Sequence, residues 1–244
     1  DKQDFLDAVD RIIGGLEKKN KVIAPNEKKT IAYHEAGHAS VSWMLEHAHP
    51  LVKVTIVPRG QALGAAWYLP EERQITTKTQ MLHQMISLLG GRASEEIVFG
   101  EVSTGALNDL ERVTKMAYSM VAYYGLNDKI GNLSYYDSSG QTEYGFTKPF
   151  SEKTAENIDS EIHIMVEEAY LKAKEILLAN REKLDKLAML LVEREVIFRE
   201  DLEEIFGKRP FGEKEDNENS TKEEVETNKE DIIVEGDNSE NKDN

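Results

Sequence analysis

The sequence predicts a mainly α-helical domain with a small β-sheet beside the helix that carries the motif HEAGH at residues 34–38. Three observations lead to this fold class. Apolar residues recur at helical spacing through most of residues 76–206. Alternating β-branched residues are confined to a short stretch between residues 51 and 69. The chain of 244 residues has no cysteine, so no disulfide framework takes the place of a packed core.

The first helix is expected over residues 30–47, a stretch without proline. Ile31, Val41 and Leu45 share one face of this helix, and both histidines of the motif fall on that face. Gly37 lies in the helix interior, where glycine costs about 1 kcal/mol relative to alanine. This cost indicates that another element packs closely against Gly37.

Two strands are expected after the first helix. Residues 51–57 alternate in the way that is typical of a strand, and Pro58-Arg59-Gly60 predicts a turn. Residues 62–69 predict a second strand, which Pro70 ends. The edge of such a small sheet can bind an extended peptide as a further strand through main-chain hydrogen bonds. The alternative is an ordinary edge strand that a loop shields.

The remaining elements are expected to be helical, with a loop over residues 136–146. The longest helix has one apolar face, which we interpret as core and subunit contacts rather than as a cofactor site. Its members are Ile158, Ile162, Met165, Ala169, Ala173 and Ile176. The helices are expected over residues 76–99, 106–124, 151–178 and 180–195, and residues 201–206 close the fold.

The HEAGH motif has the spacing of a metal site. His34 and His38 are four residues apart, so on a helix both imidazoles project from one face and can reach one metal ion. Glu35 can touch a water molecule on that metal without binding the metal itself. These residues are the minimal equipment for metal-assisted hydrolysis. The alternative is two core histidines that hydrogen-bond to the backbone, but the spacing and Glu35 favour the metal site.

A zinc site needs a third protein ligand, which must be His, Asp or Glu because the chain has no cysteine. Asp109 is the preferred candidate, since it falls on an apolar stripe with Val113 and Met120 and a buried carboxylate is costly unless it is paired or binds a metal. Glu95 is the second candidate, although Arg92, three residues away, offers an ion pair instead. The other histidines lack ligand-like spacing and are expected at the surface or as caps: His47, His49, His83 and His163.

Four segments carry a family resemblance: TIAYHEAGHA, VTIVPRGQALGAAWYLPEER, LLGGRASEEIVFG and STGALNDLERVTKMA. In this order they resemble the peptidase domain of the membrane-anchored AAA proteases of the FtsH type. The likeness covers about residues 1–209. Residues 65–67, Ala-Ala-Trp, are a minor departure that bears on side-chain preference rather than on chemistry.

The resemblance implies a zinc metalloendopeptidase with one zinc per subunit, held by His34, His38 and Asp109. Glu35 is then the catalytic base, which activates the zinc-bound water that attacks the peptide carbonyl. The resemblance also implies that extended substrate binds along the strand formed by Gly64, Ala65, Ala66 and Trp67.

Three regions are expected along the chain. Residues 1–26 resemble the end of an ATPase lid and its linker, and residues 27–209 form the peptidase domain. Residues 210–244 are expected to be a disordered acidic tail, because such a composition cannot bury enough apolar surface to offset its ordering entropy. Residues 213–244 hold 13 acidic and four basic residues, which is more than half of the net charge of −16.

The composition and the absence of certain motifs bear on nucleic-acid binding, membrane spanning and ATP binding. The acidic balance gives no support to nucleic-acid binding, and no apolar run approaches the roughly 18 residues that span a bilayer. No P-loop motif occurs, so ATP is expected to act only through a missing ATPase module.

The resemblance implies a homo-hexamer that degrades unfolded or membrane proteins. The full-length protein is expected at the cytoplasmic face of a bacterial inner membrane, held by a missing N-terminal anchor, and the fragment itself is expected to be soluble. Two alternatives stay open. One is a non-catalytic, ring-forming scaffold of the same fold. The other is a zinc hydrolase of small molecules.

Overall fold

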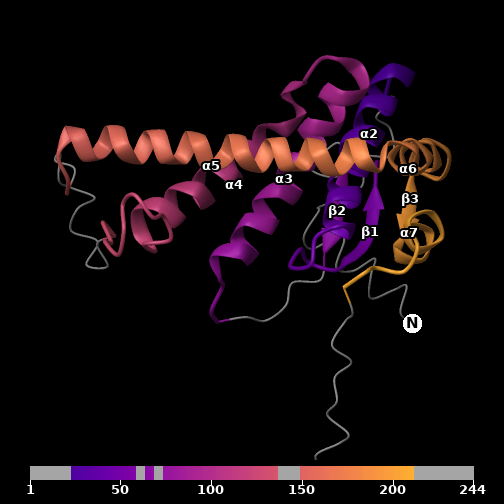
Figure 1. Cartoon of the computed structure of the whole chain (residues 1–244). Helices are drawn as coiled ribbons and strands as arrows, with labels where there is room; N and C mark the ends of the chain where they lie inside the picture. The colour runs from indigo at the N-terminus through magenta and orange to yellow at the C-terminus, as the bar shows by residue number, and fades with distance from the viewer. Residues whose placement is uncertain (1–22, 59–63, 69–73, 137–148, 212–244) are drawn as a thin grey trace, which may run out of the picture. The chain divides into compact units, whose positions relative to one another are not determined.

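The computed structural model describes residues 23–58, 64–68, 74–136 and 149–211. These residues form a mainly helical structure with a small antiparallel sheet, which confirms the predicted fold class (Figure 1). The expected lid and linker over residues 1–26 lies outside the described residues except for its last four. The expected disordered tail lies outside them beyond residue 211.

Helix α2, Pro25–Trp43, carries the HEAGH motif. It begins five residues earlier than expected, because proline suits the first helical position, where its missing N–H costs nothing. It also ends four residues earlier, so that Leu45 lies beyond the helix although it is still buried. Every residue from Ile31 to Trp43 is buried, so α2 is a central helix rather than an amphipathic surface helix.

Helix α3, Lys78–Phe99, crosses α2 at very close range. A Cβ atom on Gly37 would overlap the carbonyl oxygen of Gly90, and one on Gly90 would lie 2.7 Å from the carbonyl oxygen of Gly37. The expected close contact at Gly37 is therefore confirmed. A capping box between Thr77 and Gln80 starts α3, and Gly100, with φ of 72°, ends it in the left-handed conformation.

The sheet holds β1 (Leu51–Thr55), β2 (Ala65–Tyr68) and β3 (Val196–Phe198) in the order β2-β1-β3, all antiparallel. The two expected strands are present in shorter form. Strand β3 is a three-residue strand that the sequence reading missed. Within the described residues β2 is at the edge of the sheet, and its other side is available to a further strand.

The rest of the fold begins with a short 3-10 turn, Thr104–Ala106, which leads into α4 (Leu107–Tyr118) and a π-helical turn (Ser119–Tyr123). The remaining helices are α5 (Glu152–Ala179), α6 (Arg181–Arg194) and α7 (Arg199–Phe206).

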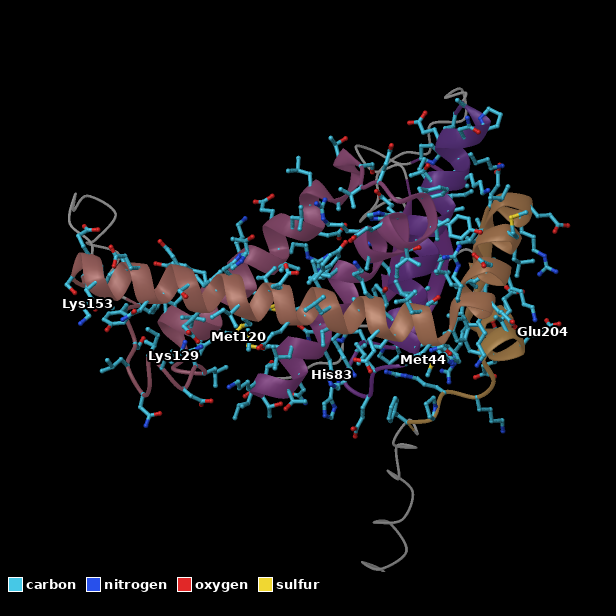
Figure 2. The ribbon with its side chains drawn as sticks, turned by 45° about the horizontal axis from the view of Figure 1, so that its top comes forward. Met44, His83, Met120, Lys129, Lys153 and Glu204 are labelled. Carbon is cyan, nitrogen blue, oxygen red and sulfur yellow. The ribbon has the colours of Figure 1, made fainter. Side chains whose placement is uncertain are left out.

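Helix α5 runs past α3 and α4, and α6, β3 and α7 gather at its C-terminal end (Figure 1). Lys153 in the first turn of α5 and Glu204 in α7 lie at opposite ends of the view in Figure 2. Four residues of the apolar face expected for α5 are buried: Ile158, Met165, Ala169 and Ala173. Leu177 is buried as well, while Ile162 and Ile176 are half-buried at the margin. Among the helices of the described ranges, none combines the length and apolar character needed to cross a bilayer.

The Gly37→Ala variant tests the close crossing. In an open helix this change stabilises by about 1 kcal/mol, since alanine has the higher helix propensity. Here the methyl group meets backbone atoms of α3, so we expect the free energy of unfolding to fall by about 1–3 kcal/mol in urea denaturation. Ser160→Ala on the exposed face of α5 is the control and should change little. A gain of stability at position 37 would contradict the crossing.

Candidate active site and metal centre

The structure brings together the three residues that the sequence predicts as metal ligands. His34 Nε2 lies 3.0 Å from His38 Nε2, and Asp109 Oδ2 lies 3.4 Å from the first and 3.5 Å from the second. Among the described residues, these three are the group whose ligand atoms converge closely enough to hold a metal ion. The two histidines come from consecutive turns of α2, and Asp109 comes from the first turn of α4.

The spacing of the three atoms fits zinc. Ligand atoms about 2.0–2.2 Å from a tetrahedral zinc ion stand about 3.3–3.5 Å apart, close to the separations in this cluster. Two imidazoles, one carboxylate and a position left for water form the donor set of catalytic zinc sites. The residues present therefore fit a zinc ion.

Both imidazole rings are fixed through their other nitrogen. His38 Nδ1 lies 2.9 Å from the carbonyl oxygen of Ser87, which can only accept, so Nδ1–H is the donor. His34 Nδ1 lies 2.7 Å from Glu95 Oε1 and donates to that carboxylate. Both Nε2 atoms are then turned toward Asp109, the orientation that a metal-binding histidine requires.

Glu95 lies outside the converging group found among the described residues and contacts the other ring nitrogen of His34. Its side chain is buried, and its second oxygen accepts a hydrogen bond of 2.6 Å from the backbone N–H of Ser103. Burial alone would raise the pKa of the carboxyl group, but the hydrogen bonds from His34 and Ser103 outweigh it and lower the pKa. Its partners are these two residues instead of the Arg92 that the sequence suggested.

The electrostatics of the cluster favour a cation. Burial would raise the pKa of Asp109, but its hydrogen bonds with both histidines outweigh burial and hold the pKa well below its usual range. Burial would lower the pKa of His34, but Asp109 and Glu95 raise it to about 10. Two ionised carboxylates therefore surround the imidazoles, a field that stabilises either protons or a metal ion there.

Glu35 lies beside this cluster and reaches toward β2. Its side chain is buried, and burial raises the pKa of the carboxyl group, while the adjacent His34 and His38 lower it. Glu35 does not belong to the converging group of ligand atoms in the part of the chain that the structure describes. This position suits a proton acceptor rather than a ligand.

A cleft of about 1020 Å³ joins the metal cluster to the sheet edge. It is lined by all three predicted ligands, by Glu35 and by Gly64, Ala65 and Ala66 of the predicted substrate strand. Trp67 takes its place in β2, but its side chain lies outside the described residues. Tyr68 also lines the cleft, and its hydroxyl group hydrogen-bonds with Ser42 of α2 at 3.1 Å.

The histidines that were expected at the surface or as caps lie apart from the metal cluster. His83 Nδ1 accepts a hydrogen bond from the backbone N–H of His47, and the two rings stack with centroids 5.2 Å apart. His49 contacts the side chain of Gln84. His163 is exposed on α5, as expected.

The sequence reading missed Gly91, which faces both ring nitrogens. A Cβ atom at this position would lie 2.6 Å from the Nε2 of His34 and 2.6 Å from that of His38. Any side chain there would therefore intrude on the space of the metal ion. The signal that could have revealed it is the Gly90-Gly91 pair inside a helix, since two interior glycines cost about 2 kcal/mol unless close packing requires them.

Together these features define the class of protein. An HExxH helix with a converging aspartate and an adjacent buried glutamate in an open cleft is the site of a metal-dependent hydrolase. Residues 21–205 match the family described as Peptidase family M41. The chain belongs to this peptidase family, and its resemblance to the FtsH type is confirmed.

Several curated relatives are highly similar. A protein of Parabacteroides distasonis named ATP-dependent zinc metalloprotease FtsH is 63% identical over 210 residues, covering 86% of this chain and 31% of the relative. A protein of the same name from Rhodothermus marinus is 53% identical over 215 residues, covering 86% of this chain and 30% of the relative. The Mus musculus mitochondrial inner membrane m-AAA protease component AFG3L2 is 49% identical over 210 residues, covering 86% and 26%. The chain thus spans about a quarter to a third of these relatives.

The Gly91→Ala variant tests the space beside the two imidazoles. The added methyl group occupies the approach to both Nε2 atoms, so we expect zinc content to fall from about one ion per chain to well below half, measured by elemental analysis of dialysed protein. Circular dichroism should show the helices retained. Arg92→Ala, at the next residue of α3, is the control and should keep its zinc. Full zinc in Gly91→Ala would show that the metal lies elsewhere.

Proposed function

We propose that this chain is the proteolytic part of an ATP-dependent zinc metalloendopeptidase, with His34, His38 and Asp109 as zinc ligands and Glu35 as the catalytic base. The observation that carries the proposal is the convergence of two imidazole Nε2 atoms and one carboxylate oxygen within 3.5 Å of one another. The opposite nitrogen of each ring is already engaged, so the free lone pairs are directed at a common point.

In the proposed mechanism each residue of the site has a separate role. Zinc, when bound, supplies a Lewis acid that polarises water and stabilises the oxyanion of the attacked carbonyl. Glu35 accepts the proton of the attacking water and then delivers it to the leaving amine nitrogen. Glu95 and the carbonyl group of Ser87 hold the two imidazoles in the tautomer and orientation that the metal needs. The walls of α2, α3 and β2 limit the access of bulk water to Glu35.

Substrate binds in this proposal as an extended strand along β2. Ala65 and Ala66 pair with Thr55 and Val54 on one side, which leaves the other main-chain edge of β2 to the cleft. Main-chain pairing is tolerant of substrate sequence, because the hydrogen bonds are made to groups that every residue carries. Such tolerance suits an enzyme that degrades unfolded or membrane proteins of many sequences.

The properties of the whole protein belong to the same proposal. The names of the relatives include ATP dependence and, for the mouse protein, the mitochondrial inner membrane. We infer that ATP acts through an ATPase module, since these 244 residues hold no P-loop motif. We also infer a homo-hexamer that is anchored at the cytoplasmic face of a bacterial inner membrane.

A non-catalytic scaffold of the same fold is the alternative. A scaffold needs only the packing of its helices. The burial of Glu35 beside two histidines costs free energy and would serve no purpose in such a protein. Burial of an ionisable group in a cleft is typical of a catalytic site. The scaffold alternative predicts that no substitution at Glu35 changes peptidase activity. Substitution of Glu35 therefore distinguishes the two proposals.

Substitutions separate the ligands from the base. His38→Ala and Asp109→Asn should lose most of the zinc, because a three-residue donor set has no local replacement. Glu35→Gln should keep about one zinc ion but lose peptidase activity by about a hundredfold or more, since only proton transfer is removed. The measurements are elemental analysis and the cleavage rate of a fluorogenic peptide.

Glu95→Gln is the matched control for the third ligand. It shortens no side chain and keeps a hydrogen-bond acceptor for His34, so we expect it to retain zinc. If Glu95→Gln loses the metal while Asp109→Asn keeps it, the assignment of the third ligand is wrong. If Glu35→Gln remains fully active, Glu35 is not the base.

The dependence on ATP can be tested with the chain alone. Unfolding a typical domain costs about 5–15 kcal/mol, and this chain has no P-loop with which to couple ATP hydrolysis to that work. We expect slow cleavage of an unfolded casein-like substrate, no cleavage of a stably folded domain and no effect of ATP on either. The assay is gel electrophoresis of both substrates over time. ATP-stimulated loss of the folded domain would overturn the division into peptidase and motor.

A further inference from the structure

Gly64 lies directly before β2 and faces the carboxyl group of Glu35. A Cβ atom built on Gly64 would lie 2.7 Å from Glu35 Oε1, 2.8 Å from its Cγ and 3.0 Å from its Cδ. The carboxyl group of the proposed base therefore occupies the space that any other residue at position 64 would fill. We propose that Gly64 is a positioning residue for Glu35: its missing side chain is the space that holds the base beside the metal ligands. This inference rests on the proposed function.

The residues next to this contact are held by other elements of the fold. Glu35 sits between two residues whose imidazoles are held by hydrogen bonds, and Gly37 fixes α2 against α3. On the other side, Ala65 is paired with Thr55 of the central strand. The flexible partner in this contact is the Glu35 side chain, so a methyl group at position 64 would displace the carboxyl group and leave the fold in place.

The face of β2 that meets α2 supports this reading. Alternate residues of a strand point to the same side, so Gly64, Ala66 and Tyr68 share one face. Tyr68 contacts Ser42 of α2, and Gly64 contacts Glu35, seven residues earlier on the same helix. Four strand residues span about 13 Å and seven helical residues about 10.5 Å, so the two segments run side by side in the same direction. Along this face the side chains become smaller from Tyr68 to Ala66, and Gly64, which lies beside Glu35, has no side chain at all.

One short segment therefore serves two distinct functions. The main chain of β2 pairs with substrate in the proposed mechanism, and a failure of that pairing would raise KM. The absence of a Cβ atom at Gly64 keeps Glu35 in place, and a failure there would lower kcat. These two parameters distinguish a role in positioning the base from a role in binding substrate or in stability.

The test is Gly64→Ala in the full chain, with kcat and KM measured on a fluorogenic peptide. We expect kcat to fall by about tenfold or more, KM to change by less than about twofold, and zinc content and melting temperature to stay near those of the parent chain. Glu35→Gln, in which the proposed base is already absent, provides the second background. Because no base is left to displace, Gly64→Ala should change the residual kcat by less than about twofold in that background.

Each contrary result has a separate meaning. An unchanged kcat in Gly64→Ala would overturn the inference, as would a rise in KM alone or a loss of zinc. Equal losses of kcat in the parent and Glu35→Gln backgrounds would also overturn it, because independent sites give additive effects. Full activity of Glu35→Gln would instead reject the proposed function itself, so the two failures can be told apart.

Discussion

The close crossing of α2 and α3 is the constraint on which the site depends. Gly37 and Gly90 let the two backbones touch, and this distance brings one face of α3 directly over the imidazoles. Ser87, Gly91 and Glu95 follow one another at intervals of four residues on that face. The first and last of them orient the two rings, and the glycine between them leaves room for the metal. If the two helices were farther apart, Ser87 and Glu95 would no longer hold the two rings, and Gly91 would no longer lie beside their Nε2 atoms.

The part of the site that is local in sequence could be predicted from sequence alone. The two histidines and Glu35 lie within five residues, so helical geometry alone relates them. Asp109 was found through the cost of a carboxylate on an apolar stripe. The role of Glu95 could not be decided in this way, because its partner His34 is 61 residues away and a nearby arginine offers an equally simple ion pair. Only the fold shows which partner Glu95 has.

For the fold as well, the elements with a clear local sequence pattern could be predicted, and those that depend on distant contacts could not. Helix α5, and α4 taken together with the π-helical turn that follows it, were predicted to within one residue at each end, since one buried face gives a clear period. The bounds of α2 were less accurate, because a helix buried on all sides has no such period. Strand β3 was missed because three residues carry little signal, and its pairing with β1 joins segments more than 140 residues apart. Its existence depends on tertiary packing rather than on local preference.

The three carboxyl groups around the imidazoles differ in pKa because they differ in their contacts. Glu95 accepts a hydrogen bond from His34, Asp109 lies beside both imidazoles, and both carboxyl groups have lowered pKa values that keep them ionised. Glu35 is governed chiefly by burial, which raises its pKa. Groups of one type whose pKa values are pushed apart by their surroundings are the usual basis for assigning acids and bases. This difference supports the proposed division, in which the two ionised carboxylates act on the metal and its ligands and Glu35, beside Gly64, moves the proton.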